Sequence, residues 1–230
     1  SDGKNYKIPK DKEPETLEWL ENNPGMTLWD VGANIGLYAC YYAGACGGNV
    51  VAFEPSPFNL RQLVKNINVN KLDSTIQVVT NPLSNVTGPN SFLLGDLTEG
   101  GALSAFGVDH GFDGAPMRTT NSFVATGFTG DKLVADEVCP FPNLIKLDVD
   151  GIEHLVLSGM ATILNDPRCL SVLVEINDEF EAQSKQSSQL LTEAGFVMQK
   201  KTHGKILENS PKFVSTFNQI WQRPSGIVNV

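Results

Sequence analysis

Residues 30–36 combine a carboxylate with closely spaced glycines. They read Asp-Val-Gly-Ala-Asn-Ile-Gly, between an apolar run and a helix-competent run. This order predicts a strand, a tight turn and a helix start, where an α/β sheet holds a nucleotide-like cofactor. Gly32 would let the backbone approach a ligand closely, and Gly36 would let the helix pack on the strand. Asp30 is expected to accept hydrogen bonds from a ligand amine or hydroxyl.

A second acid, Glu54, ends the next apolar run, about 18 residues beyond Gly36. A carboxylate at this place accepts hydrogen bonds from both ribose hydroxyls of a bound nucleoside. NAD sites use an acid there too, so Glu54 alone does not distinguish the cofactors. The spacing of residues 30–36 differs from the G-x-G-x-x-G of dinucleotide sites and favours S-adenosylmethionine. The alternative is that Asp30 and Glu54 only cap the two following helices.

A third cluster of charge follows the apolar run 144–147. Alternation along an extended chain places Lys146, Asp148 and Asp150 on one side. Carboxylates this close repel one another unless a metal ion, a shared proton or Lys146 lies between them. One of them, Asp148 first, could take the proton from a substrate hydroxyl, so these three are the predicted catalytic residues. The alternative is a capping box, with Asp150 as N-cap and Glu153 three residues later.

The next strand tip adds further oxygen ligands. Glu175 and Asn177 end an apolar run that is expected to neighbour the one before Asp148. Oxygen donors from two adjacent tips suit a hard divalent cation, for which Mg²⁺ is the usual candidate. Asp148, Glu175 and Asn177 are therefore the predicted metal ligands.

These groups need a sheet to bring them together, and the chain alternates strands and helices accordingly. The order up to residue 79 is typical of right-handed crossovers in a parallel sheet. Pro57 after Ser56 marks a helix start, and Gly195 marks a helix end. The predicted strands are 27–31, 50–53, 76–79, 144–148, 172–176, 196–199 and 217–221. The predicted helices are 34–45, the stretch after Ser56–Pro57, 152–164 and 184–194.

Residues 81–131 interrupt this rhythm. They are rich in glycine and polar residues with scattered phenylalanines, and only 91–94 reads as a strand, one half of a hairpin. Long loops in compact domains are usually functional or disordered, and the aromatics favour an ordered cover, so we expect a substrate lid. Residues 1–25 are expected to form an arm and a short helix, and 26–230 a single domain.

Composition limits the partners. The net charge of −9 and the pI of about 4.8 argue against nucleic acid, whose binding proteins usually show a basic stripe. No apolar run approaches the roughly 20 residues that a membrane span needs. No signal-peptide pattern starts the chain, which favours a cytoplasmic location.

Several motifs in order resemble the FkbM family of S-adenosylmethionine-dependent methyltransferases. They are residues 30–36, Phe-Glu-Pro-Ser-Pro at 53–57, Asn66, Asn68 and Asn70, Pro-Leu-Ser-Asn at 82–85, Ile-Lys-Leu-Asp-Val-Asp-Gly-Ile-Glu at 145–153, and Val-Glu-Ile-Asn at 174–177. The resemblance implies a Rossmann-like class I methyltransferase fold, with a mostly parallel seven-stranded sheet whose last strand is antiparallel. It also implies O-methylation of a hydroxyl on a sugar or small metabolite.

By this resemblance the strand 144–147 tip would face the reacting groups. The family motif there usually reads Asp-Val-Glu-Gly, and Asp150 stands here in place of the glutamate. The residues that would hold the cofactor are Asp30, Gly32, Ala33, Asn34, Gly36, Glu54 and Pro55. Two alternatives stay open: an NAD-dependent oxidoreductase with a degenerate fingerprint, and a non-catalytic binding protein on the same fold.

Overall fold

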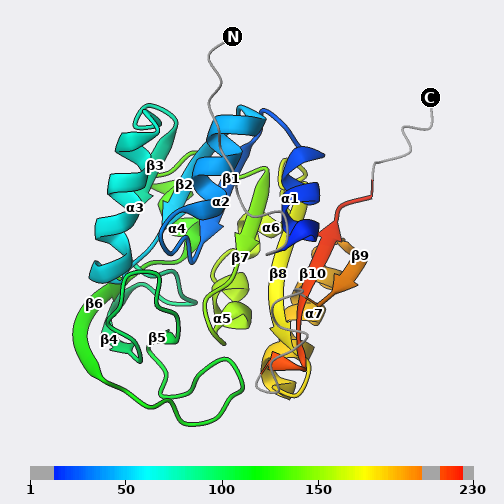
Figure 1. Ribbon diagram of the computed structural model, residues 1–230. Coiled ribbons are helices and arrows are strands. Elements are labelled where there is room, and N and C mark those ends of the chain that lie inside the picture. Colours follow the sequence, from blue (N-terminus) through cyan, green and yellow to red (C-terminus); the bar gives the residue numbers. More distant parts are fainter. Residues whose placement is uncertain (1–12, 204–212, 225–230) are drawn as a thin grey trace, which may run out of the picture.

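A computed structural model describes residues 13–203 and 213–224 (Figure 1). Its centre is a seven-stranded sheet in the order β3-β2-β1-β7-β8-β10-β9. The strands are β1 (Thr27–Val31), β2 (Asn49–Phe53), β3 (Ile76–Val79), β7 (Leu144–Leu147), β8 (Ser171–Asn177), β9 (Val197–Thr202) and β10 (Thr216–Gln222). Only β10 runs antiparallel to its neighbours, which confirms the predicted mostly parallel sheet with an antiparallel last strand.

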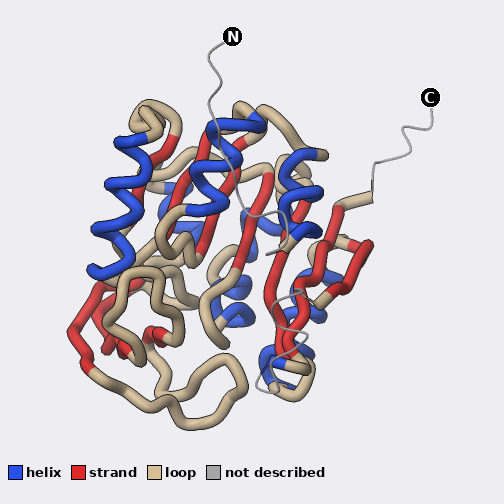
Figure 2. The backbone as a smooth tube through the Cα atoms, viewed as in Figure 1, coloured by secondary structure: helices blue, strands red, loops and turns tan. Residues whose placement is uncertain are grey.

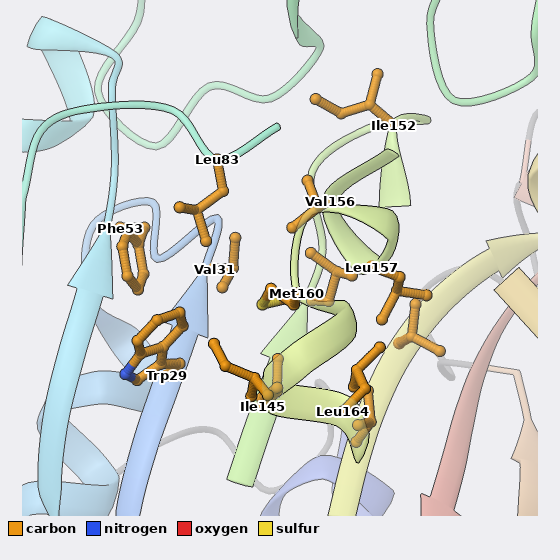
Figure 3. Packing of buried hydrophobic residues seen from close by; sticks show 14 of the residues in the cluster. Trp29, Val31, Phe53, Leu83, Ile145, Ile152, Val156, Leu157, Met160 and Leu164 are labelled. Carbon is orange, nitrogen blue, oxygen red and sulfur yellow. The ribbon is translucent and has the colours of Figure 1, made fainter. Parts of the chain in front are cut away.

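Helices cover both faces of this sheet (Figure 2). Successive strand side chains point to opposite faces of the sheet and contribute to two apolar clusters, one under α1, α2 and α3 and the other under α4 to α7. Figure 3 shows the second cluster, in which Trp29 and Phe53 from the strands lie on the same side as Met160 and Leu164. The helices are α1 (Pro14–Glu21), α2 (Leu37–Tyr41), the π-helical turn η1 (Tyr42–Cys46), α3 (Pro57–Val69), α4 (Gly130–Ala135), α5 (Glu153–Ser158), α6 (Ala161–Asn165) and α7 (Glu181–Glu193).

Two predicted helices differ from the structure. The predicted helix 34–45 begins only at Leu37, because Gly36 before it has a φ of +80° and ends a separate turn. The predicted helix 152–164 is broken into α5 and α6 at Gly159. A Cβ there would lie 2.1 Å from the backbone oxygen of Ser84, so the chain around residue 84 packs directly on the break.

The insertion is a small sheet rather than a loop with one hairpin strand. β4 (Gly88–Leu94), β5 (Ser104–Phe106) and β6 (Asn121–Gly127) pair antiparallel in the order β5-β4-β6, beneath α3 in the view of Figure 1. Phe92 of β4 is buried and stands opposite Phe106 and Phe123. Most side chains of β6 are exposed, so its sequence lacks the alternation that predicts a strand.

Helix α1 confirms the predicted short helix before the first strand. Its Trp19 Nε1 donates to Ser171 Oγ at 2.9 Å, and its Glu15 accepts from Asn218 at 3.0 Å. Both partners belong to the sheet, so α1 packs on β8 and β10. The predicted arm before it lies outside the described residues, and the predicted boundary at residue 26 stays a prediction. Among the described helices, none has the length and apolar character that crossing a membrane requires.

Candidate active site

A cavity of about 300 Å³ opens at the carboxyl ends of β1, β2 and β7. This end of a parallel sheet is where α/β proteins bind their ligands. The cavity is lined by the turn 31–35, by Glu54 and Pro55, by the β7–α5 connection and by residues 100–106 of the insertion. The sheet therefore brings together three of the four strand tips singled out in the sequence, and the tip with Glu175 and Asn177 does not line the cavity.

Glu54 forms part of the cavity wall and fixes the turn beside it. One carboxylate oxygen accepts from the backbone N–H of Asn34 at 2.7 Å, and the other from that of Ser56 at 2.8 Å. The residue is 5% exposed, and burial raises its pKa to about 7 despite these two hydrogen bonds. A carboxylate oxygen accepts about two hydrogen bonds, so Glu54 retains capacity for a ligand. It is not the cap of α3, whose N-cap residue is Ser56.

Both glycines allow close packing, and the partner of Gly36 differs from the prediction. Gly32 has a φ of +83°, and a Cβ there would lie 1.8 Å from the backbone oxygen of Asp148. Its close approach is therefore to the β7–α5 connection. At Gly36 a Cβ would lie 2.3 Å from a methyl of Leu63, so this glycine makes room for α3 rather than for the strand. Gly32 lines the cavity with Ala33, Asn34 and Pro55, whereas Gly36 does not.

Asp30 is buried beside the cavity, with 1% exposure, and does not line it. Its register partner on β7 is Lys146, on the α2 face of the sheet. Burial raises the pKa of Asp30 to about 6, and the Lys146 ammonium opposes this rise. Neither carboxylate oxygen has a hydrogen-bond partner among the described residues. Asp30 therefore interacts with the charge of Lys146. The contact of Asp30 with a ligand stays a prediction.

Lys146 and Asp148 form an ion pair in the cavity wall. Lys146 Nζ lies 2.9 Å from Asp148 Oδ2, with the lysine side chain 2% exposed and the aspartate side chain 33% exposed. Burial would lower the pKa of Lys146, but the carboxylates of Asp148 and Asp30 outweigh it and raise that pKa. The ammonium also lies 5.1 Å from the centre of the Tyr38 ring. A permanently charged cation therefore holds a carboxylate that the cavity can reach.

Asp150 lines the cavity, but it does not continue the strand alternation that was predicted to place it beside Lys146 and Asp148. Its φ is +59°, so the predicted alternation ends with the strand at Leu147. Its Oδ2 accepts the backbone N–H groups of Leu103 at 2.8 Å and Ser104 at 3.2 Å. The carboxylate thus fastens the insertion to the β7–α5 connection. The alternative capping box is also wrong, because α5 begins at Glu153 with Ile152 as its N-cap residue.

Two of the three predicted metal ligands have other partners. Asp148 pairs with Lys146, and the Asn177 side-chain oxygen accepts from the N–H of Glu179 at 3.0 Å. Burial, followed by the charge of Asp148, raises the pKa of Glu175 well above its ordinary value. Over the described part of the chain no three His, Cys, Asp or Glu residues gather where a metal ion could bind. The structure gives the Mg²⁺ prediction no support.

Three polar residues of the cavity wall, Asn59, Tyr38 and Glu13, were not predicted as site residues. Asn59 of α3 accepts from the N–H of Gly100 at 2.9 Å and donates to the Gly101 oxygen at 3.0 Å, which holds the insertion over the cavity. Tyr38 and Glu13 complete the wall near Lys146. A polar residue after a predicted helix start was the only hint for Asn59; the other two lie outside every quoted motif.

Comparison with known proteins identifies the family. The model of the Methyltransferase FkbM domain matches residues 30–199, which is more than half of the chain. The chain belongs to the FkbM methyltransferase family. This match confirms the resemblance drawn from the motifs and gives no support to an NAD-dependent oxidoreductase.

Relatives of this FkbM chain agree with the assignment. It is 34% identical over 167 residues to hexuronic acid methyltransferase AglP of Haloferax volcanii, covering 73% of this chain and 62% of that protein. The chain therefore spans less than two thirds of the length of this relative. A precorrin-6y C5,15-methyltransferase from Geobacter metallireducens superimposes with a TM-score of 0.55 at 10% identity, over 98% of this chain and 94% of that one. This likeness shows the class I methyltransferase fold.

Proposed function

We propose that this chain is an S-adenosylmethionine-dependent methyltransferase that methylates a hydroxyl oxygen of a saccharide or similar small acceptor. The observation that carries the proposal is the Lys146–Asp148 pair, which lies in the wall of the same cavity as Glu54 and the turn 31–35. Membership of the FkbM family supports the reaction class.

The residues present fit the cofactor. Glu54 offers remaining acceptor capacity to ribose hydroxyls, beside the turn 31–35. Phe92 and Phe106 supply apolar surface in the same cavity, which suits an adenine ring. When bound, S-adenosylmethionine would supply an electrophilic methyl group on its sulfonium.

Asp148 is the group proposed to handle the proton. Its partly exposed carboxylate can accept a hydrogen bond, and then the proton, from an acceptor hydroxyl in the cavity. Lys146 holds that carboxylate in place through a charge-assisted hydrogen bond. The remaining catalysis would come from aligning the hydroxyl oxygen with the methyl group in the cavity.

The acceptor class is inferred from the relative and the insertion. AglP is described as acting on a hexuronic acid, and we extend only the saccharide class to this chain. Residues 100–106 are proposed as the lid over the acceptor, in a methyltransferase domain spanning 26–230. Nucleic acid as acceptor stays disfavoured by the net charge of −9. The cytoplasmic location stays a prediction.

The test combines binding and turnover. S-Adenosylmethionine and S-adenosylhomocysteine (SAH) should each raise the melting temperature of the full chain, whereas NADH should not. Methyl transfer is then assayed on methyl glycosides of a hexuronic acid and of the matching neutral hexose. A chain that responds to NADH alone, or to none of these, would refute the proposal.

A matched pair of variants isolates the catalytic carboxylate. Asp148→Asn should lower kcat by about 10²-fold or more while SAH affinity changes little, because the proton acceptor is lost but the cofactor wall is not. Asp136→Asn is the control, since Asp136 is the half-exposed C-cap residue of α4 and pairs with Lys132. Equal rates for the two variants would exclude Asp148 as the proton acceptor.

A further inference from the structure

A buried hydrogen-bond network lies behind the β7–α5 connection. Glu153, the first residue of α5, is 1% exposed. Its carboxylate accepts the backbone N–H of Val149 at 3.0 Å and that of Gly151 at 3.1 Å. One side chain therefore holds two amides of the short segment that carries Asp148.

Gln183 of α7 extends this network to β8. Its buried side-chain Nε2 donates to the Glu153 carboxylate, and its Oε1 accepts the N–H of Asn177 at 2.8 Å. A backbone N–H can only donate, so the Asn177 N–H requires the Gln183 side-chain oxygen to face β8. The NH2 group of Gln183 must then face Glu153. The network thus runs in one direction, from the end of β8 through α7 to the segment 149–151.

The chemistry of Glu153 follows from its partners. Val149, Gly151 and Gln183 all present N–H groups to it, so the site suits a group that only accepts hydrogen bonds. A carboxylate is such a group, whereas an amide of the same shape would turn one N–H against another. Since the site is buried, an unmade hydrogen bond there is not replaced by water.

We propose that Glu153 and Gln183 are positioning residues for methyl transfer, which hold the Asp148 carboxylate against the cofactor side of the cavity. This inference rests on the proposed function. The link to the cofactor side is steric: the Asp148 backbone oxygen lies so close to Gly32 that no Cβ fits between them. A shift of residues 149–151 therefore changes where Asp148 stands relative to the turn 31–35.

An exchange of the two side chains tests the direction of the network. Glu153→Gln alone sets the new amide N–H against Gln183, and Gln183→Glu alone sets two carboxylates together. The double variant restores the contact between the two side chains, because the new amide at 153 donates to the new carboxylate at 183, which still accepts from Asn177. The oxygen that remains at 153 keeps the N–H groups of Val149 at 3.0 Å and Gly151 at 3.3 Å. All three variants keep the shape of the side chains.

The readouts are kcat on the glycoside that the wild-type chain methylates faster, SAH affinity, and amide exchange of residues 148–152. We expect each single variant to lower kcat about tenfold and to speed exchange, with SAH affinity within about threefold of wild type. The double variant should recover kcat to within about threefold. A double variant no faster than the slower single variant, or single variants with wild-type kcat, would overturn the proposal.

The chain offers a control and a way to separate failures. Gln189 and Glu193 form an exposed pair of the same kind on α7, at 2.8 Å, and the same exchange there should change nothing. If the wild-type chain binds no SAH, the proposed function fails. Unchanged amide exchange of 148–152 in both single variants, with SAH binding intact, refutes the positioning role alone.

Discussion

Gly32→Ala is the substitution whose effect follows most directly from the coordinates. The new Cβ would stand 1.8 Å from the Asp148 backbone oxygen and 2.9 Å from its carbonyl carbon, both backbone atoms that no side-chain rotation can remove. The φ of +83° adds a conformational cost, because an alanine rarely adopts it. The substitution should therefore push apart the cofactor turn and the segment carrying Asp148.

The magnitude has two parts. A left-handed backbone on a non-glycine residue costs about 1–3 kcal/mol, and overpacking of a rigid site typically costs about 1–3 kcal/mol more. Gly25→Ala is the matched control, since Gly25 has a φ of +73° and nothing within 4 Å of its Cβ position. It carries the first cost without the second, and the effect of alanine on the unfolded chain cancels between the two variants.

Urea unfolding of both variants measures this difference. Gly32→Ala should lose about 1–3 kcal/mol more unfolding free energy than Gly25→Ala, and its melting temperature should be lower by roughly 2–4 °C for each kcal/mol. Its SAH affinity should fall, whereas that of Gly25→Ala should not. Equal stability of the two variants would refute the reasoning about close packing at the turn.

Three further predictions concern the cavity wall. SAH affinity should rise with pH through about pH 7 and level off near pH 8, because burial raises the pKa of Glu54 to about 7 and only the ionised carboxylate accepts from both ribose hydroxyls. Calorimetry across pH should show this rise, and Glu54→Gln should flatten it. Asp150→Ala should lower the unfolding free energy by about 1–3 kcal/mol and speed amide exchange of residues 100–106, while Asp150→Asn, which keeps one acceptor oxygen, should lose less. Lys146→Met should destabilise by about 3 kcal/mol in urea unfolding, since it leaves the buried carboxylate of Asp30 and the partly exposed one of Asp148 without their cation; an unchanged midpoint would contradict the assigned ion pair.

The sequence predicted the parallel part of the fold because its signals are local. A buried strand such as β2 reads as a continuous apolar run from Val50 to Phe53, and Pro57 and Gly195 mark helix ends by their own backbone preferences. The insertion sheet was missed because β6 exposes most of its side chains, so no alternation remains to detect. The break between α5 and α6 depends on contact with Ser84, which lies far away in sequence.

In the candidate site too, local features were predicted from the sequence and features that depend on distant contacts were not. Glu54, Lys146 and Asp148 were singled out by charge at strand ends, and the structure brings all three to one cavity. The direction of Asp150 was missed, because a positive φ just after the strand ends the alternation. The contact of Gly32 with the Asp148 backbone was not predicted, because only the folded chain brings that second strand end near; its approach to a ligand stays a prediction.

The central claim is that this cavity holds S-adenosylmethionine with Glu54 in its wall. Calorimetric titration of SAH at pH 8, where Glu54 is ionised, tests it most directly, on the wild-type chain and on Glu54→Gln. We predict saturable binding in the micromolar range to the wild-type chain, weakened at least about tenfold, or 1.4 kcal/mol, by the substitution. No binding of SAH to the wild-type chain, or equal affinity for both chains, would contradict the account.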